Sequence, residues 1–257
     1  MAIEKTRALV IRATPFGETS SVVSLYCREF GKLRALAKGA WRPKSGFDGG
    51  LDLLSISQVL VLRKSSGGLD LLTEASLESR FRVGTSLAAV LGGLRVAELL
   101  DALTADGDPQ PELFEVAHAT VRRLSGWDQD EAVIPTLIAG FELALLSLCG
   151  HAPVLDHCVE CHGSLPQRSR TAFGMLDGGT LCDLCRRHRR GVVSVSAAAL
   201  AAMRTLSRRD VDEGSGIPGN VAGEIRGIMN TSIAHLLGRP LRVPATLARG
   251  IRRQRRP

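Results

Sequence analysis

Two Cys-x-x-Cys pairs with twenty residues between them constrain this chain more than any other feature of its sequence. The pairs are Cys158 with Cys161 and Cys182 with Cys185. Four thiolates at this spacing are a typical ligand set for tetrahedral Zn²⁺, and four protein ligands leave no position for a reacting water. The residues between the pairs include four glycines and few apolar side chains, so this segment has too little core to fold alone. We therefore predict one structural zinc ion that organises it.

Other uses of these cysteines fit the sequence less well. A disulfide framework suits secreted chains, but we find only six cysteines in 257 residues and expect no signal peptide. A thioredoxin-type redox site needs one such motif in a βαβ setting, not two matched ones. Four histidines lie close enough in sequence to replace a cysteine, although we expect them to be loop residues around the metal: His151, His157, His162 and His188.

The chain carries a net charge of +7, which favours a polyanionic partner. Residues 28–44 hold six cations against one acid, and two arginine clusters occupy residues 186–190 and 252–256. No stretch is apolar for long enough to cross a membrane, so we expect a cytoplasmic protein.

Strand and helix patterns divide the chain into regions. Short β-rich runs are expected at residues 6–12, 20–27, 32–38, 55–63 and 69–73, the last two joined by a turn at 65–68. Five such strands suggest a small closed barrel, of which the OB-fold is the commonest type. Apolar residues at helical spacing follow, with further helices at about 195–208 and 219–237 joined by a linker at 210–220.

The expected fold class is α+β, with an N-terminal five-stranded OB-fold barrel followed by an all-α domain that carries the four-cysteine zinc module. The expected boundaries are 1–80 for the barrel, 81–155 for the helical domain, 156–190 for the zinc module, 191–246 for C-terminal helices that pack on the helical domain, and 247–257 for a basic tail.

The third expected strand carries the clearest binding signal. Alternation places Leu33, Ala35 and Ala37 on one face and Lys32, Arg34, Leu36 and Lys38 on the other. Cations interleaved with aromatic residues are typical of surfaces that bind single-stranded nucleic acid. An edge strand protected from aggregation by lysines is the alternative. The candidate nucleic-acid-binding residues are Arg28, Lys32, Arg34, Lys38, Trp41, Arg42 and Lys44.

Motifs for common catalytic sites are missing from the sequence. It has no Walker-type phosphate loop, no dinucleotide fingerprint and no nucleophile elbow. A zinc deaminase needs H-x-E followed by P-C-x-x-C, whereas here His157 and Glu160 are spaced H-x-x-E. We therefore expect a protein that is not an enzyme.

Ten short segments, taken in order, carry a resemblance to one family. They are residues 8–12, 15–18, 31–34, 37–40, 42–45, 141–146, 150–153, 155–158, 178–182 and 236–239. Together these segments resemble the bacterial RecO family of recombination mediators over nearly the whole chain.

This resemblance implies a role in DNA repair and homologous recombination. A RecO-like protein binds single- and double-stranded DNA, anneals complementary strands and assists recombinase loading in the RecF pathway. The implied partners are RecR, the single-strand-binding protein and, indirectly, RecA, and the implied location is the cytoplasm, with the nucleoid. Lys32, Arg34, Lys38, Arg42 and Lys44 match basic positions of the family's DNA-binding domain.

Two features temper this resemblance. Trp41 stands where the family usually has an arginine, which exchanges one phosphate contact for a stacking surface. Some members of the family lack the cysteines, which implies that zinc stabilises the protein without being essential to annealing.

Three other functions are also compatible with parts of the sequence. A zinc-stabilised RNA-binding or transcription-associated protein would carry a similar basic barrel. A nuclease or deaminase would use the zinc catalytically, and an adaptor would offer its charge to an acidic protein tail.

Overall fold

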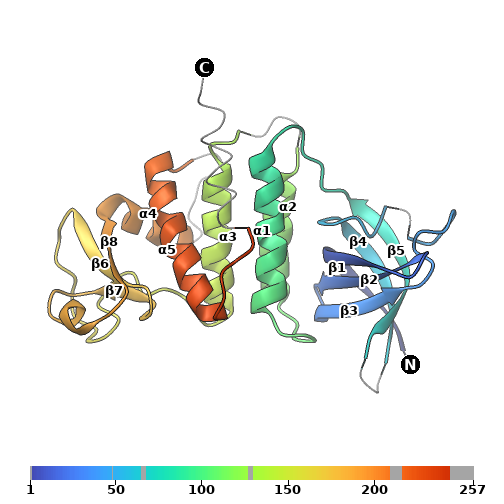
Figure 1. Ribbon diagram of the computed structural model, residues 1–257, viewed down its shortest axis with the longest axis horizontal. Coiled ribbons are helices and arrows are strands. Elements are labelled where there is room, and N and C mark those ends of the chain that lie inside the picture. The colour runs from blue at the N-terminus through green and yellow to red at the C-terminus, as the bar shows by residue number, and fades with distance from the viewer. Residues whose placement is uncertain (1, 48, 65–67, 127–129, 209–215, 244–257) are drawn as a thin grey trace. The chain divides into compact units, whose positions relative to one another are not determined.

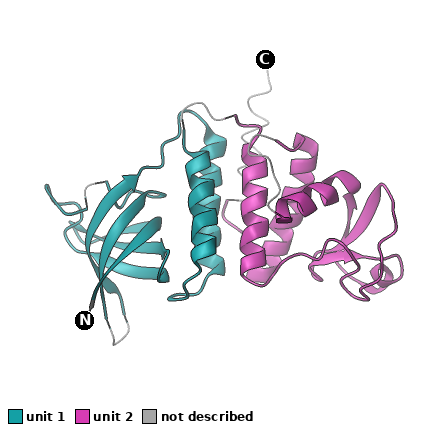
Figure 2. Ribbon diagram, turned by 180° about the vertical axis from the view of Figure 1, so that it is seen from behind, with its two compact units in different colours: residues 1–129 teal, residues 130–257 magenta. Residues whose placement is uncertain are grey.

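The computed structural model describes residues 2–47, 49–64, 68–126, 130–208 and 216–243. The chain forms two compact units, residues 1–129 and residues 130–257, shown separately coloured in Figure 2. This division falls inside the segment 81–155 that the sequence suggested as one helical domain. Within the described ranges, no helix is both long and apolar enough to span a bilayer.

Five strands in the first unit form a closed barrel (Figure 1). They are β1 (Ala2–Phe16), β2 (Ser20–Cys27), β3 (Gly31–Ala37), β4 (Ile56–Arg63) and β5 (Asp70–Ser79). The strand order β1-β2-β3-β5-β4, with β3 parallel to β5, is that of an OB-fold and confirms the predicted fold class. Strands β1 and β5 extend beyond the expected runs, and residues 65–67 of the turn expected at 65–68 lie outside the described residues.

The barrel core is built from small and aliphatic side chains. Leu33, Ala35 and Ala37 of β3 point into it, as the alternation predicts, together with Val23 and Leu25 of β2. Because so few aromatic residues are present, many short side chains must interdigitate to fill the interior.

Two helices complete the first unit: α1 (Leu87–Leu103) and α2 (Pro111–Leu124). The hydroxyl of Ser86 caps α1 by accepting from the N–H of Ala89, and Pro111 begins α2 at a position where its missing N–H costs little. Gly93 lets α1 approach the barrel closely, since a Cβ there would lie 2.5 Å from Leu54 Cδ1.

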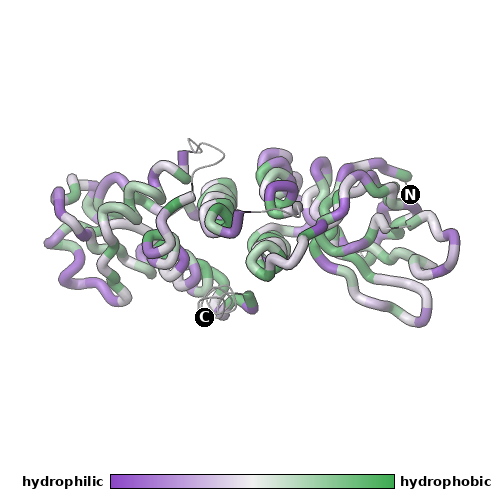
Figure 3. Tube along the Cα trace, turned by 90° about the horizontal axis from the view of Figure 1, so that it is seen from above, coloured by the Kyte–Doolittle hydropathy of each residue, from purple (hydrophilic) through white to green (hydrophobic). Residues whose placement is uncertain are grey.

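The second unit combines three helices with a small sheet (Figures 1 and 2). Its helices are α3 (Ile134–Leu148), α4 (Ala197–Arg208) and α5 (Gly219–Leu237), and each contacts the other two. Hydrophobic residues recur along the helices in Figure 3, and their buried faces form the core of this unit. Gly238, at φ 64°, ends α5 in the left-handed conformation that favours glycine.

The cysteine-bearing segment contains a three-stranded antiparallel sheet in the order β7-β6-β8. The strands are β6 (Arg170–Gly174), β7 (Gly179–Leu181) and β8 (Val192–Ser196), with a short 3₁₀ turn, η1 (Cys185–His188), before β8. Sequence patterns do not predict this sheet, because β7 is short and two of the strand ends are glycines.

Candidate nucleic-acid interface and metal centre

The outer face of β3 carries the cations that the sequence analysis singled out. Arg34 is exposed on this face, and Lys38 is exposed just after the strand ends. Among the described residues, no ion pair involves Arg34, Lys38, Arg42 or Lys44. These four charges are therefore available to an anionic ligand.

A further cation lies in register with this row. Arg12 of β1 is paired with Ser24 of β2, and Ser24 is paired with Arg34 of β3. Directly opposed residues share a face, so the exposed Arg12 and Arg34 flank the buried Ser24 on the outer face of the barrel, about 10 Å apart across two strand spacings. Strand alternation in the sequence does not reveal Arg12 as a member of this row, because an irregularity between Val10 and Arg12 shifts the register of β1.

Lys32 lies on the same strand, but its ammonium group is already bound. It donates hydrogen bonds to the carbonyl oxygens of Asp101 and Thr104, each at 2.7 Å. It also lies 3.4 Å from a carboxylate oxygen of Asp106, and its side chain is only 12% exposed. Carbonyls at the C-terminal end of a helix attract a cation, so Lys32 ties β3 to α1.

Arg28 is also engaged. Its guanidinium lies 2.8 Å from Glu115 of α2 and 3.3 Å from Glu29. The hydrogen bond to Glu115, and then that to Glu29, raises the pKa of Arg28. Arg28 therefore contributes less free positive charge than Arg34 does.

The segment after β3 forms a cavity of about 650 Å³ in the first unit. Trp41, Arg42 and Lys44, all suggested by the sequence, line this cavity. Arg80 lines it as well and forms an ion pair with Asp52 at 3.0 Å. Sequence reasoning did not find Arg80, which follows β5 and is brought to this loop only by barrel closure.

The four cysteines of the double motif converge in the second unit. Their sulfur atoms all lie within 4.8 Å of one another, and the sulfurs of Cys161 and Cys182 are 3.8 Å apart. A regular tetrahedron with Zn–S bonds of about 2.3 Å has S–S edges of about 3.8 Å. The donor set and its spacing therefore fit a four-coordinate metal ion.

Local hydrogen bonds shift the pKa values of these thiols in different directions. Burial opposes ionisation of Cys158, but the N–H groups of Cys161 and Cys182 outweigh it and lower the pKa to about 6. The N–H of Cys185, 3.5 Å from the sulfur of Cys182, lowers the pKa of Cys182. A hydrogen bond with Cys182 raises the pKa of Cys185 to about 12. Metal binding needs thiolates, so it would release the proton of Cys185.

Gly179 allows the first cysteine pair to lie against β7. A Cβ at this position would lie 2.8 Å from the carbonyl oxygen of Val154 and 3.0 Å from the Cβ of Val159. Val159 also donates its N–H to the carbonyl oxygen of Thr180 at 2.8 Å. Because β7 leads directly to Cys182, this contact brings the two cysteine pairs together.

The arginine cluster beside the second pair is partly neutralised. Arg189 pairs with Glu160 and, at 3.2 Å, with Asp177. Arg186 lies 3.4 Å from Asp183. The second arginine cluster, at 252–256, lies outside the described residues.

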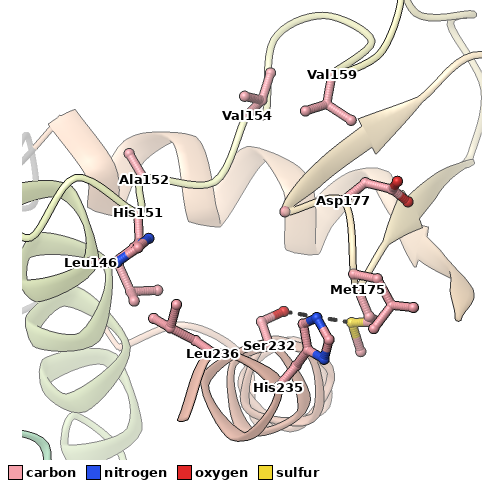
Figure 4. Close-up of a pocket in the computed structure, with 12 residues that line it drawn as sticks. Leu146, His151, Ala152, Val154, Val159, Met175, Asp177, Ser232, His235 and Leu236 are labelled. Atoms are coloured by element: carbon pink, nitrogen blue, oxygen red, sulfur yellow. Dashed lines mark hydrogen bonds between the residues drawn. The ribbon is translucent and has the colours of Figure 1, made fainter. Parts of the chain in front are cut away.

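A second cavity, of about 290 Å³, lies between α3, α5 and the small sheet (Figure 4). Leu146, Val154, Val159 and Leu236 give it a mainly apolar lining. Such a lining suits an apolar group better than a phosphate backbone. The free cations of the barrel therefore remain the better candidate interface for nucleic acid.

Comparison with known proteins shows to which family the chain belongs. Residues 1–81 match the family described as Recombination protein O N terminal, and residues 84–244 match Recombination protein O C terminal. The chain is 33% identical to the DNA repair protein RecO of Rhodopirellula baltica, over 92% of this chain and 96% of that protein. It is also 33% identical to the DNA repair protein RecO of Myxococcus xanthus, over 91% of this chain and 93% of that protein. The chain therefore belongs to the RecO family of DNA repair proteins.

Proposed function

We propose that this protein is a recombination mediator that binds DNA through the outer face of its barrel. The proposed surface consists of Arg12, Arg34, Lys38, Arg42 and Lys44, with Trp41 beside them. Contacts to phosphates read no sequence, as a repair factor requires. Lys32 and Arg28 are left out of this surface because their charges already have partners.

The row of exposed cations in register across β1 and β3 is the observation that carries this proposal. Two complementary strands repel each other because both are dense in phosphate. A surface that neutralises part of that charge lowers the barrier to their pairing, so strand annealing follows from binding. Neither step needs bond chemistry, and a non-enzymatic role is therefore proposed.

Salt-dependent binding of a single-stranded oligonucleotide tests the surface. Five phosphate contacts predict a slope of log affinity against log salt of about −3.5, at about −0.7 per contact. The double variant Arg34→Glu with Lys38→Glu should bind oligonucleotides of every sequence more weakly, and its log affinity should fall less steeply with log salt.

The matched control reverses the same number of charges elsewhere on the first unit. Lys5 in β1 and Lys64 after β4 are both exposed, so Lys5→Glu with Lys64→Glu makes the same change in net charge. If both double variants lose affinity equally, the effect comes from net charge alone and the proposed surface is wrong.

We further propose that the protein assists recombinase loading together with RecR and the single-strand-binding protein, and acts on RecA indirectly. The supporting argument is family membership. Annealing of complementary oligonucleotides coated with single-strand-binding protein tests binding and mediation together. If the wild-type protein anneals these coated strands no faster than the Arg34→Glu, Lys38→Glu variant does, this face has no mediator role.

The cysteine site is proposed to hold one structural zinc ion. Cys158, Cys161, Cys182 and Cys185 would be its ligands, and four thiolates leave no coordination position for a substrate or water. Its contribution would be to hold the second unit's small sheet in place.

A further inference from the structure

The cavity beside the cation row has the size and lining of a binding pocket for a small planar group. Its volume of about 650 Å³ falls within the range of about 300–1,000 Å³ typical of small-ligand sites. Phe47 and Leu51, 7% and 6% exposed, form its buried apolar wall, whereas Trp41 is 57% exposed. An aromatic ring at the mouth and an apolar wall inside suit a ring that enters from solvent.

The walls of this cavity are fixed by hydrogen bonds before any ligand binds. The backbone N–H of Trp41 donates to the carbonyl oxygen of Thr19 at 2.9 Å, and the hydroxyl of Ser45 donates to the carbonyl oxygen of Ala40 at 2.9 Å. The carbonyl of Gly50 accepts from the hydroxyl of Ser57 at 2.8 Å. A preformed pocket loses little conformational freedom on binding.

Gly50 also sets how deep the loop can lie. A Cβ at this position would lie 2.5 Å from the carbonyl oxygen of Ala75 in β5, so only glycine allows this approach. Beside it, the guanidinium of Arg80 is held against the backbone of Gly49 and paired with Asp52. Polar groups therefore border the apolar wall on one side.

Cations flank the same cavity. Arg42 and Lys44 line it, and neither has an ion-pair partner within the described part of the chain. A nucleotide presents this same combination, because a flat apolar ring is attached to an anionic backbone. Base–aromatic stacking tolerates every base, since each has a π-face.

We propose that this cavity receives one unstacked nucleobase of a single strand, with Trp41 as its stacking surface and Arg42 and Lys44 on the adjacent phosphates. The inference rests on the proposed DNA-binding function and adds a strand preference to it. A paired base must leave its stack before it can enter, so the cavity favours single strands over duplex. Trp41 thus determines strand preference, and the phosphate contacts determine overall affinity.

A double comparison of protein and oligonucleotide tests this. Binding of a single-stranded oligonucleotide is measured against an abasic oligonucleotide of equal length, which keeps every phosphate but offers no base. Trp41→Ala should weaken binding of the normal oligonucleotide about 5-fold to 150-fold and leave that of the abasic one unchanged. The wild-type protein should show a similar loss on going to the abasic strand.

Phe16→Ala is the matched control, because Phe16 is as exposed as Trp41, at 57%, but does not line the cavity. It should change neither affinity. Fluorescence gives an independent readout: in a Trp127→Phe background Trp41 is the one remaining tryptophan, and single-stranded DNA should quench it more than duplex does.

The outcomes separate this inference from the function beneath it. If Trp41→Ala weakens binding of both oligonucleotides equally, or of neither, the proposed base pocket is wrong, but binding through phosphates is not affected by that result. If the wild-type protein binds neither oligonucleotide at low salt, the DNA-binding function and the pocket are both wrong.

Discussion

The ammonium of Lys32 donates a hydrogen bond to the carbonyl oxygen of Thr104 at 2.7 Å, so a barrel strand holds the C-terminal cap of α1. This contact gives one of the suggested DNA-binding lysines a different role. Strand alternation places Lys32 and Arg34 on the same face, but Lys32 contacts α1 and its C-terminal cap whereas Arg34 is exposed.

Lys32→Met should therefore lower stability without changing the salt dependence of DNA binding. A hydrogen bond to a buried charged group contributes about 1.5–3 kcal/mol, so unfolding in urea should show a loss of about 2 kcal/mol. Arg34→Met is the matched control, and its exposed side chain predicts a change within about 0.5 kcal/mol. The salt slope should become shallower by about 0.7 for Arg34→Met alone. A shallower slope for Lys32→Met would return Lys32 to the DNA surface.

Metal analysis should find one zinc ion per chain. Removing it with a chelator, or changing Cys182→Ser, should destabilise the second unit by several kcal/mol, since structural zinc supplies about 10–16 kcal/mol of apparent folding free energy in small modules. Proteolysis should then cut within residues 153–196. Cys149→Ser is the control, because Cys149 lies outside the four-cysteine cluster. A metal-free protein of equal stability would show that the thiols do not bind zinc.

His118 should make the first unit less stable in acid. Burial, and then the nearby charge of Arg7, lowers the pKa of His118, with further influence from Glu115, Arg122 and Glu78. The unfolded chain, with a histidine pKa of about 6.5, then binds the proton more readily than the folded one. The contribution of His118 to stability is thus fully present above about pH 6.5 and is lost as the pH falls toward the lower pKa of His118 in the folded protein.

Thermal unfolding between pH 8 and pH 5 measures this effect. His118→Gln should flatten the dependence in this window, whereas His151→Gln, at an exposed histidine, should leave it as in the wild type. Identical curves for wild type and His118→Gln would refute the assignment.

Glu224 should act as a clamp between α5 and the small sheet. Its carboxylate accepts from the N–H of Ser196 at 2.9 Å and from Arg170 at 2.8 Å. Burial opposes ionisation, but the hydrogen bonds from Ser196 prevail and lower the pKa of Glu224. This stabilisation is present above the unfolded pKa of about 4.3 and is lost as the pH falls through the folded value.

Glu224→Gln should therefore lower the free energy of unfolding at pH 7 by about 1–2 kcal/mol. Glu18→Gln, at an exposed turn of the first unit, should have no such effect. Equal stability of wild type and Glu224→Gln at neutral pH would show that the carboxylate charge is not needed there.

The sequence was sufficient to predict the features that depend on local patterns. Alternation in β3 identified the inward residues Leu33, Ala35 and Ala37, and cysteine spacing predicted the cluster of four thiols. Both patterns repeat over a few residues, so neither depends on how distant segments meet.

The remaining features depend on contacts between segments far apart in the chain. Arg12 joins the cation row through a register that an irregularity in β1 determines, and Arg80 reaches the cavity only after the barrel closes. Lys32 was assigned to the DNA surface because alternation defines a face without showing what covers it. Contacts between distant segments leave no recognisable pattern in a single sequence, so they could not be predicted from it.

The parallel pairing of β3 with β5 is the shortest strand ladder of the barrel among the described residues. Within the described ranges it pairs only Ala35 with Asp70, Leu36 with Leu71 and Ala37 with Leu72, whereas β1 and β2 pair along the whole length of β2. A short ladder opens more readily than a long one, so amide hydrogens along it should exchange with solvent before those between β1 and β2. Since Arg34 and Lys38 border this ladder, its opening would change the spacing between the charges of the proposed DNA-binding surface, and a bound strand would in turn hold the ladder closed.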